Sequence, residues 1–459
     1  MRIYLTIFQL LYFSYNLLSQ NWQQLGSGAS MSVHSMKVNP QDNKLYVGGW
    51  FSKINNVQVS GLAKFDGNSF SQISNAIPPF VADTNSIYAS AVYGIDFFNN
   101  NIYVRGNLFG IMENYQINKC LGYFNGIDWL GIPQIKHTDQ SSIFVDSNRI
   151  FFNNYVAGVP YTNYYKPFTY IMDQLGNIDS LCFPYPLSSG TTFSNIITTT
   201  KYKGKYYFGG NVNGYDSIAI SEDFFEWDGG SELTVVDGGI RGGTSYINAF
   251  AHYNDELYLG GYWLQADGNL SNTIMKYDGI TLKPVFGFGT QNYITSMIVH
   301  NNILYMCGNF NDVNGIHDIN NIVYYDGNDF KYLDTLDFDN TIATIEFYNN
   351  ELYVGGGFWT IGNDSVSRIA KYTGVLPTGS KKIKEVFSIV KIYIDPLSQI
   401  LNITTSTNFN ETKIFNLQGQ LVIAHTFVKQ VDVSYLQSGM YVIELKNDKE
   451  KVWEKFVKE

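Results

Sequence analysis

The chain has 459 residues, of which 45% are hydrophobic and 15% charged, and its formal net charge is −10. This composition excludes a disordered chain and a coiled coil, and the acidity disfavours nucleic acid or an anionic membrane surface as a partner. The three cysteines, Cys120, Cys182 and Cys307, form no CxxC pair, which argues against a disulfide framework and a structural zinc site, and we interpret them as small core residues.

The first residues have the pattern of an export signal. A basic residue, Arg2, precedes an apolar run that is interrupted by polar residues and ends at Leu18, and Ser19 offers a small side chain at a cleavage point. Because this run is short for a membrane span, we predict a secretory signal peptide at residues 1–19, the alternative being a retained N-terminal anchor. No later stretch is long and apolar enough to cross a bilayer, so we expect no membrane span in the mature chain.

A short motif, first seen as Leu45-Tyr46-Val47-Gly48-Gly49, recurs along most of the chain. Its aromatic residue returns at intervals of 47 to 57 residues, as Tyr46, Tyr103, Phe151, Tyr207, Tyr258, Tyr305 and Tyr353. A period of about 50 residues is typical of β-propeller blades. The repeats therefore predict seven blades.

Each repeat is consistent with four strands. Polar pairs such as Asn99-Asn100 tolerate positive φ and predict a tight hairpin between the first and second strands. The second strand carries paired glycines such as Gly48-Gly49, which weaken a strand unless another backbone or a bulky side chain must come close. Asp-Gly pairs such as Asp66-Gly67 predict the hairpin to an aromatic-bearing fourth strand. The third repeat is degenerate, with Asn153-Asn154 where the glycines would stand.

The last repeat lacks a fourth strand, because the chain runs from Tyr372 into Leu376-Pro377. The segment that begins at Trp22 has the form of a fourth strand with no preceding three. We therefore predict that the Trp22 segment pairs with the Ile369–Tyr372 strand and closes a ring, which removes exposed sheet edges. The predicted fold is all-β, with a seven-bladed β-propeller at residues 20–374 closed by an N-terminal strand.

The composition changes after a predicted linker at residues 375–384. From Lys381 to Glu459 there are 11 lysines against nine acidic residues, so the tail is weakly basic and the rest of the chain is acidic. Short apolar or alternating runs, such as 387–394 and 441–445, are separated by turn signals such as Asp395-Pro396. This pattern predicts a small Ig-like β-sandwich at residues 385–459.

The repeat region resembles known propeller families from Trp22 to about Gly374. Two glycines, then an aromatic residue before Asp-Gly, then Trp or Phe, resemble the kelch and galactose-oxidase-type repeat. The Val-Gly-Gly-x-Phe form is closer still to the repeats of cortical-marker-type surface proteins. No WD dipeptide occurs at the expected place, which argues against a WD-type propeller.

The tail carries a second set of motifs, namely Ile392-Tyr393 with Asp395-Pro396, the segments 414–420 and 436–443, and a lysine-bearing end at 455–458. Over its full length it is similar to the type A C-terminal sorting domain of the type IX secretion system. That family usually has Pro-Asn-Pro where this chain has Ile394-Asp395-Pro396. The resemblance implies that residues 385–459 engage the type IX machinery. It also implies passage through the periplasm and outer membrane, removal of the tail, and release or attachment at the cell surface.

The candidate binding residues lie mainly in long connections on one face of the predicted propeller. They are Tyr161, Tyr164 and Tyr165 in the third repeat and Arg241 in the crossing from the fourth repeat to the fifth. Arg105 joins them because it replaces the first glycine of the second repeat, where a lone charge must face a polar channel or be paired. Aromatic rings stack and guanidinium binds in a planar fork, so these residues suit a glycan or a surface-protein ligand. The alternative is that the tyrosines only cover hydrophobic surface.

No pattern indicates catalysis, a metal or another cofactor. The six histidines are scattered, no HExxH or Gly-x-Ser-x-Gly occurs, and turn chemistry explains the Asp and Asn residues of loops such as 311–315. The galactose-oxidase resemblance suggests a copper radical site, but that site needs a Tyr-Cys crosslink and two His ligands, and packing explains the cysteines.

We therefore expect a secreted or cell-surface binding or adhesion protein. The alternative is a secreted carbohydrate-active enzyme, a lyase or glycosidase. No pair of carboxylates is evident in the sequence where first strands would converge, which favours binding.

Overall fold

The computed structural model describes residues 21–458 apart from internal gaps, the longest at 74–79, 136–141, 157–165, 184–194, 212–219, 286–292 and 380–389. The predicted signal peptide at 1–19 lies outside the described residues. The described part of the chain contains strands and turns, and no helix. It divides into two compact units, with the division after residue 381.

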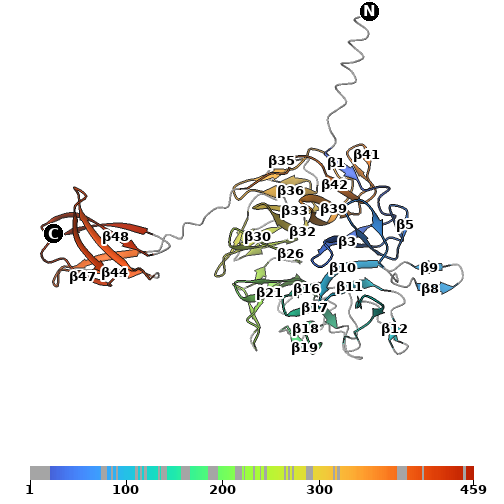
Figure 1. Cartoon of the computed structure of the whole chain (residues 1–459), viewed down its shortest axis with the longest axis horizontal. Helices are drawn as coiled ribbons and strands as arrows, with labels where there is room; N and C mark the ends of the chain where they lie inside the picture. The colour runs from blue at the N-terminus through green and yellow to red at the C-terminus, as the bar shows by residue number, and fades with distance from the viewer. Residues whose placement is uncertain are drawn as a thin grey trace, which may run out of the picture. The chain divides into compact units, whose positions relative to one another are not determined.

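A four-stranded antiparallel sheet recurs through the first unit (Figure 1). The first sheet consists of β2 (Val33–Asn39), β3 (Lys44–Gly49), β6 (Leu62–Phe65) and β7 (Phe70–Ser71). The next sheets are β10 (Ala91–Phe98), β11 (Asn101–Asn107), β14 (Leu121–Phe124) and β15 (Trp129–Leu130); β16 (Ile143–Asp146), β17 (Arg149–Val156), β18 (Lys166–Asp173) and β19 (Ile178–Cys182); and β20 (Asn195–Tyr202), β21 (Lys205–Asn211), β23 (Phe224–Trp227) and β24 (Leu233–Val235). After these come β26 (Tyr246–Tyr253), β27 (Glu256–Tyr262), β30 (Ile274–Tyr277) and β31 (Leu282–Pro284); and β32 (Tyr293–His300), β33 (Ile303–Asn309), β36 (Ile322–Tyr325) and β37 (Phe330–Tyr332); these two groups of four are joined by the pairing of Tyr262 on β27 with Tyr293 on β32. The last sheet is β38 (Ile342–Tyr348), β39 (Glu351–Gly356) and β42 (Ile369–Tyr372) with β1 (Trp22–Gln24).

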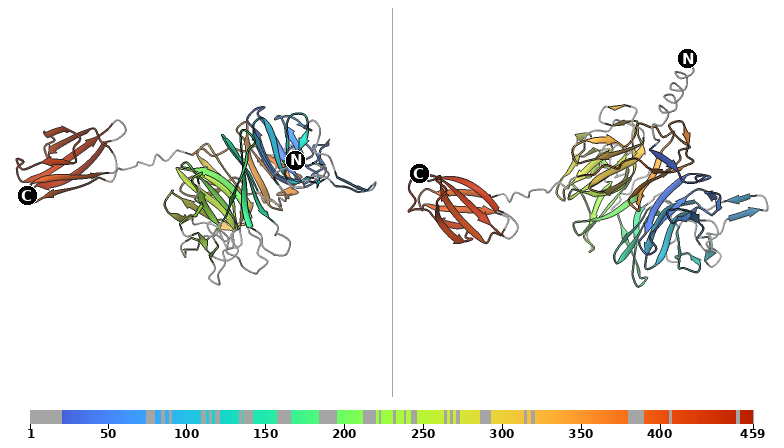
Figure 2. Two further views of the ribbon diagram at one scale, coloured as in Figure 1. Left: turned by 90° about the horizontal axis from the view of Figure 1, so that it is seen from below. Right: turned by 45° about the horizontal axis from the view of Figure 1, so that its top comes forward.

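The first strands of successive sheets are neighbours around a closed circuit. β2 lies beside β10 on one side and β38 on the other, and the order between them is β10, β16, β20, β26, β32, β38. Figures 1 and 2 show the sheets following one another around a centre. This arrangement is a β-propeller, in which each sheet buries its faces against its neighbours.

The predicted closure by the N-terminal segment is confirmed. β1 pairs antiparallel with β42, with Trp22 opposite Tyr372. The Trp22 ring is buried, with its centroid 5.2 Å from that of Phe338 and 5.0 Å from that of Tyr372. The predicted hairpins are confirmed as well, since both residues of pairs such as Asn99-Asn100 have positive φ.

The paired glycines make room for two different neighbours. A Cβ on Gly48 would lie 2.7 Å from Val92 Cγ1 in the next sheet, and a Cβ on Gly49 would collide with the carbonyl oxygen of Ser32 in its own sheet. The second approach occurs where β2 is bulged, between Val33 and Ser35. The same two contacts recur at Gly209-Gly210, Gly260-Gly261 and Gly355-Gly356. Close approach of a side chain and a backbone, the reason predicted for the glycines, is thus confirmed.

Other residues take the place of the first glycine in three sheets, namely Arg105, Asn153 and Cys307. Cys307 is a buried free thiol that packs among apolar side chains, as predicted for a core cysteine. The side chains of Cys120 and Cys182 lie outside the described ones.

The second unit has two antiparallel sheets. One has the order β43 (Val390–Asp395), β44 (Ile400–Thr405) and β47 (Gln430–Asp432). The other has the order β46 (Leu421–Thr426), β45 (Glu411–Asn416), β48 (Gly439–Lys446) and β49 (Lys451–Lys458). Leu401 of the first sheet and Ile414 and Ile443 of the second are fully buried in one shared core. Over the described residues of both units, no helix has the length and apolarity needed to span a membrane.

Candidate functional site

Connections of the first unit gather at one end of its strands. Because Val33 at the start of β2 pairs with Gly49 at the end of β3, the starts of first strands and the ends of second strands lie on the same face. Short hairpins project there between second and third strands, such as β4 (Lys53–Ile54) with β5 (Val57–Gln58), and β40 (Thr360–Ile361) with β41 (Asp364–Ser365). We call this the loop-bearing face.

The structure describes only some of the predicted binding residues. Tyr161, Tyr164 and Tyr165 lie outside the described residues. Arg241 lies in β25 (Ile240–Arg241), where it pairs with Ile220 of β22 (Ile220–Ser221), but its side chain is not among those described. Only Arg105 can be placed in full.

Arg105 lies beside two ring side chains near the start of the first strands. It pairs with Gly94 of β10, and a Cβ on Gly94 would lie 2.8 Å from Arg105 Nε, so the glycine leaves room for the arginine. The rings of His34 and Tyr93 meet edge to face at 5.0 Å. Burial lowers the pKa of His34, and the Arg105 charge lowers this pKa further. Burial raises the pKa of Tyr93, with Arg105 opposing it. Near neutral pH this cluster therefore presents a neutral imidazole, a phenol and one cation.

A row of tyrosines crosses adjacent sheets on the same face. The rings of Tyr246 and Tyr262 are 6.2 Å apart, and those of Tyr262 and Tyr293 are 6.4 Å apart. The Tyr293 hydroxyl lies 3.4 Å from Thr341 Oγ1 and accepts a hydrogen bond from Asn309 Nδ2 at 3.5 Å. All three rings are partly exposed. Sequence analysis missed this row, although Tyr246 and Tyr293 each begin a first strand and each directly precede an isoleucine.

Two carboxylates occupy equivalent positions on first strands, each opposite the aromatic residue of the repeated motif. Asp96 on β10 and Glu346 on β38 each accept a hydrogen bond from the N–H of the next residue at 2.9 Å. Lys37, on the strand between them, donates to Asp96 Oδ2 at 2.6 Å. Burial raises the pKa of Glu346 to about 7, against the opposing effects of the backbone N–H and of Lys37. Sequence analysis missed this pair because the acids are 250 residues apart and differ in type.

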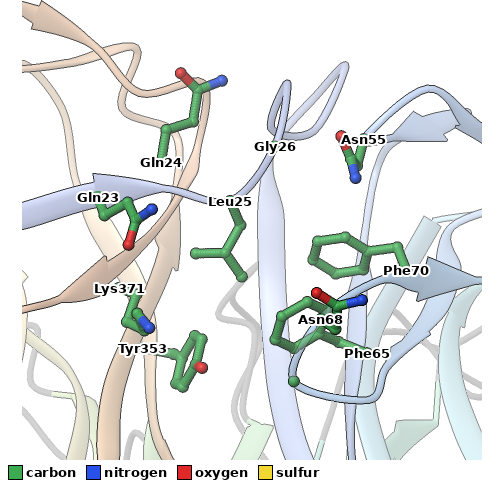
Figure 3. A pocket seen from close by; sticks show the side chains of 11 residues that line it. Gln23, Gln24, Leu25, Gly26, Asn55, Phe65, Asn68, Phe70, Tyr353 and Lys371 are labelled. Atoms are coloured by element: carbon green, nitrogen blue, oxygen red, sulfur yellow. The ribbon is translucent and has the colours of Figure 1, made fainter.

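A cleft of about 190 Å³ lies where β1 meets the first sheet (Figure 3). Leu25 projects between Tyr353 on one side and Phe65 on the other, and amide side chains line the walls. The Lys371 ammonium is held by Glu351 at 2.9 Å. This volume is below the roughly 300–1,000 Å³ of ordinary ligand pockets, so the cleft fits only a small polar group.

Among the described residues, no group of three or more His, Cys, Asp or Glu side chains is arranged to hold a metal ion. The described residues of the loop-bearing face offer aromatic rings, hydroxyls, amides and isolated charges.

Comparison with known families identifies the second unit. Residues 391–459 match the family described as the secretion system C-terminal sorting domain. The tail is a sorting domain. It directs the protein through type IX secretion to the cell surface or the outside. No curated protein matches the chain.

Three solved structures that are similar to this chain are 10–12% identical to it in sequence. The extracellular domain of a putative one-component system from B. thetaiotaomicron is 12% identical, with a TM-score of 0.48, over 95% of this chain and 47% of that one. The β-propeller domain of the Trilobed protease from Pyrococcus furiosus is 10% identical, with a TM-score of 0.41, over 78% of this chain and 98% of that one. PorZ, a surface component of the type IX secretion system of Porphyromonas gingivalis, is 12% identical, with a TM-score of 0.25, over 91% and 69%. The chain spans about half the length of the first of these structures.

Proposed function

We propose that the protein is a secreted or cell-surface binding and adhesion module whose loop-bearing face takes a glycan or a surface protein. The observation that carries this proposal is the row formed by Tyr246, Tyr262 and Tyr293, three partly exposed rings in mutual contact on a sheet scaffold. A tyrosine offers an apolar ring and a polar hydroxyl together, and a site on rigid strands loses little entropy when it binds. Arg105 adds a cation to the same face.

The proposal includes a finer account of the architecture. The ring is a seven-bladed, kelch-like β-propeller at residues 20–374, followed by a linker at 375–384 and an Ig-like sorting domain at 385–459. The circuit of first strands and the two facing sheets of the tail support this account. Tyr161, Tyr164, Tyr165 and Arg241 remain proposed as further ligand contacts on the loop-bearing face.

A glycan array, with a parallel screen against surface proteins, tests the binding proposal. The mature chain is expected to bind at least one ligand, and Tyr262→Ala, which removes the middle ring of the row, is expected to weaken that binding at least about tenfold. Tyr332→Ala is a suitable control because Tyr332 is also exposed but lies on the fourth strand β37. Equal binding by both variants and the wild type would contradict the proposed site.

A second candidate function is a secreted carbohydrate-active enzyme, a lyase or glycosidase. Asp96 and Glu346 favour it, because a carboxyl group whose pKa is raised by burial, as that of Glu346 is, suits a general acid, and the Asp96 carboxyl on the other side of β2 offers a second carboxyl group. Release of reducing ends or unsaturated products from polysaccharides, lost in both Glu346→Gln and Asp96→Asn, would establish this function. No release by the wild type would remove it.

The sorting domain is proposed to engage the type IX machinery through residues 385–459. Deletion of these residues should leave the propeller in the periplasm, whereas surface delivery without them would contradict this assignment. Fractionation of cells that express the two forms distinguishes the outcomes.

A further inference from the structure

Three large apolar side chains are exposed along one short segment of the loop-bearing face. Trp50 is 52% exposed, Trp359 is 51% exposed and Met31 is 42% exposed. Large aromatic side chains usually bury most of their surface, so two half-exposed tryptophans that flank one short segment need an explanation. We call these three residues the tryptophan patch. They belong to neither the tyrosine row nor the Arg105 cluster.

The patch is assembled by the segment 29–32, which leads from β1 into β2. At one end, Arg368 Nη1 donates to the carbonyl oxygens of Ala29 and Ser30 at 3.0 and 2.9 Å, and its guanidinium lies 3.3 Å from the centroid of the Trp359 ring. At the other end, the Trp50 N–H donates to the Ser32 carbonyl oxygen at 2.8 Å. Because a chain extends at most ~3.6 Å per residue, the two attachment points lie within about 10 Å.

Both tryptophans are held by backbone hydrogen bonds. The Trp359 N–H donates to Asp339 Oδ1 at 2.7 Å, and its carbonyl oxygen accepts from the N–H groups of Val366 and Ser367 at 2.8 and 3.2 Å. Since the guanidinium of Arg368 covers one face of this indole, the exposed half of the ring lies away from the arginine. The Trp359 ring is therefore pre-organised by Arg368, and a ligand that stacks on it need not order this side chain.

We infer that the tryptophan patch binds a neutral glycan by stacking of pyranose rings on the two indoles, an inference that rests on the proposed function and locates its glycan contacts. The C–H face of a sugar ring complements an aromatic plane, and sugar hydroxyls need nearby polar atoms. The exposed Ser30 supplies one, because its Oγ already accepts from the N–H groups of Ser52 and Lys53 at 3.1 Å each and keeps its own proton to donate.

Charge and surface pattern favour a neutral glycan over other ligands. Arg368 is 5% exposed and its guanidinium is already bonded to two carbonyl oxygens, so it is poorly placed to bind an anion from solvent. A net charge of −10 disfavours stacked nucleotides. A stable protein interface buries about 800 Å² on each partner around an apolar centre, whereas here backbone and serine hydroxyls separate the apolar groups.

Affinity electrophoresis of the mature full-length chain in gels containing soluble xylan, mannan or β-glucan tests the inference. Retardation of the wild type by at least one polysaccharide is expected, with at least a tenfold weaker affinity in the Trp50→Ala/Trp359→Ala double variant. Trp453→Ala, which removes a 50% exposed tryptophan from β49 of the sorting domain, should bind as the wild type does. Trp359→Phe, which keeps a stacking ring, should retain most of the affinity, and thermal unfolding of all four chains monitors folding.

The outcomes separate this inference from the proposed function. Unchanged affinity in a folded double variant would overturn the patch while glycan binding stands. A wild type that binds a surface protein but no polysaccharide would overturn the patch and leave the adhesion function. A wild type that binds neither would overturn both.

Discussion

Asn153 on β17 and Thr199 on β20 join two neighbouring sheets by a hydrogen bond, whereas four other sheets have glycine at the position of Asn153. Asn153 Nδ2 donates to Thr199 Oγ1 at 2.7 Å and to Ser142 Oγ at 2.6 Å, while Asn153 Oδ1 accepts from Thr169 Oγ1 at 2.7 Å. The asparagine is only 4% exposed. The degenerate third repeat thus replaces the usual fit of glycine against an apolar side chain with a paired polar contact.

Thr199→Val should lower the free energy of unfolding by about 1–3 kcal/mol. The substitution keeps the shape of the side chain but leaves the buried amide of Asn153 with one hydrogen bond fewer, and unsatisfied buried donors are costly. Urea unfolding of the full chain measures the change. Thr234→Val on β24, where the threonine is exposed, should change stability by no more than about 0.5 kcal/mol. A similar effect of both substitutions would contradict the importance of the Asn153 contact.

Gly356 and Gly357 provide a second matched pair. A Cβ at Gly356 would collide with the Thr341 carbonyl oxygen, whereas a Cβ at Gly357 would have its nearest contact at 3.4 Å, with Asn340. Gly356→Ala should therefore destabilise the fold by about 1–3 kcal/mol or more, and Gly357→Ala by less than about 1 kcal/mol. Thermal unfolding of the two variants measures the difference. Equal midpoints would mean that the bulged first strand moves aside without cost.

Local patterns in the sequence predicted much of the fold. The Asn-Asn turns and the pairing of the Trp22 segment with β42 follow from residue types that serve one backbone conformation or complete a missing strand. The paired glycines were also interpretable, because a strand accepts glycine at a close approach.

Contacts between sheets could not be predicted in the same way. They depend on which residue of one repeat faces which residue of the next, and this is fixed only when the ring is assembled. Arg368 donates a hydrogen bond to the Ala29 carbonyl oxygen although 339 positions separate the two residues in sequence. Asp96 and Glu346 lie on the strands at either side of β2, which carries Lys37, and both interact with this lysine. Of the predicted site, Arg105 is placed beside His34 and Tyr93, whereas the tryptophan patch depends on contacts of Arg368 that no local pattern shows.

The Glu346 carboxyl should make stability depend on pH. Its pKa is about 7 in the folded protein against an ordinary value of 4.5, so the folded state binds the proton more tightly than the unfolded chain. The contribution of Glu346 to the free energy of unfolding is fully present below pH 4.5. It falls by up to about 3 kcal/mol as pH rises through 7. Glu346→Gln should remove this decline and be more stable than the wild type at pH 8.

The comparison uses urea unfolding of both chains at pH 5 and pH 8, since the difference between them isolates Glu346 from other titrating groups. Asp66→Asn, at an exposed turn, serves as a control that should not abolish the decline. Parallel curves for the wild type and Glu346→Gln would show that this carboxyl titrates normally.

The burial of Trp22 should govern how readily the pairing of β1 with β42 opens. Trp22→Ala removes a buried indole from between Phe338 and Tyr372 and should cost about 3–5 kcal/mol. Hydrogen exchange should accelerate first in β1 and β42, because their pairing depends on this side chain, and later in β24, which belongs to a distant sheet. Gln23→Ala on the same strand is a control, since Gln23 is exposed and its substitution keeps the backbone ladder. Uniform acceleration of hydrogen exchange in all sheets would indicate global unfolding and would contradict a local opening at β1 and β42.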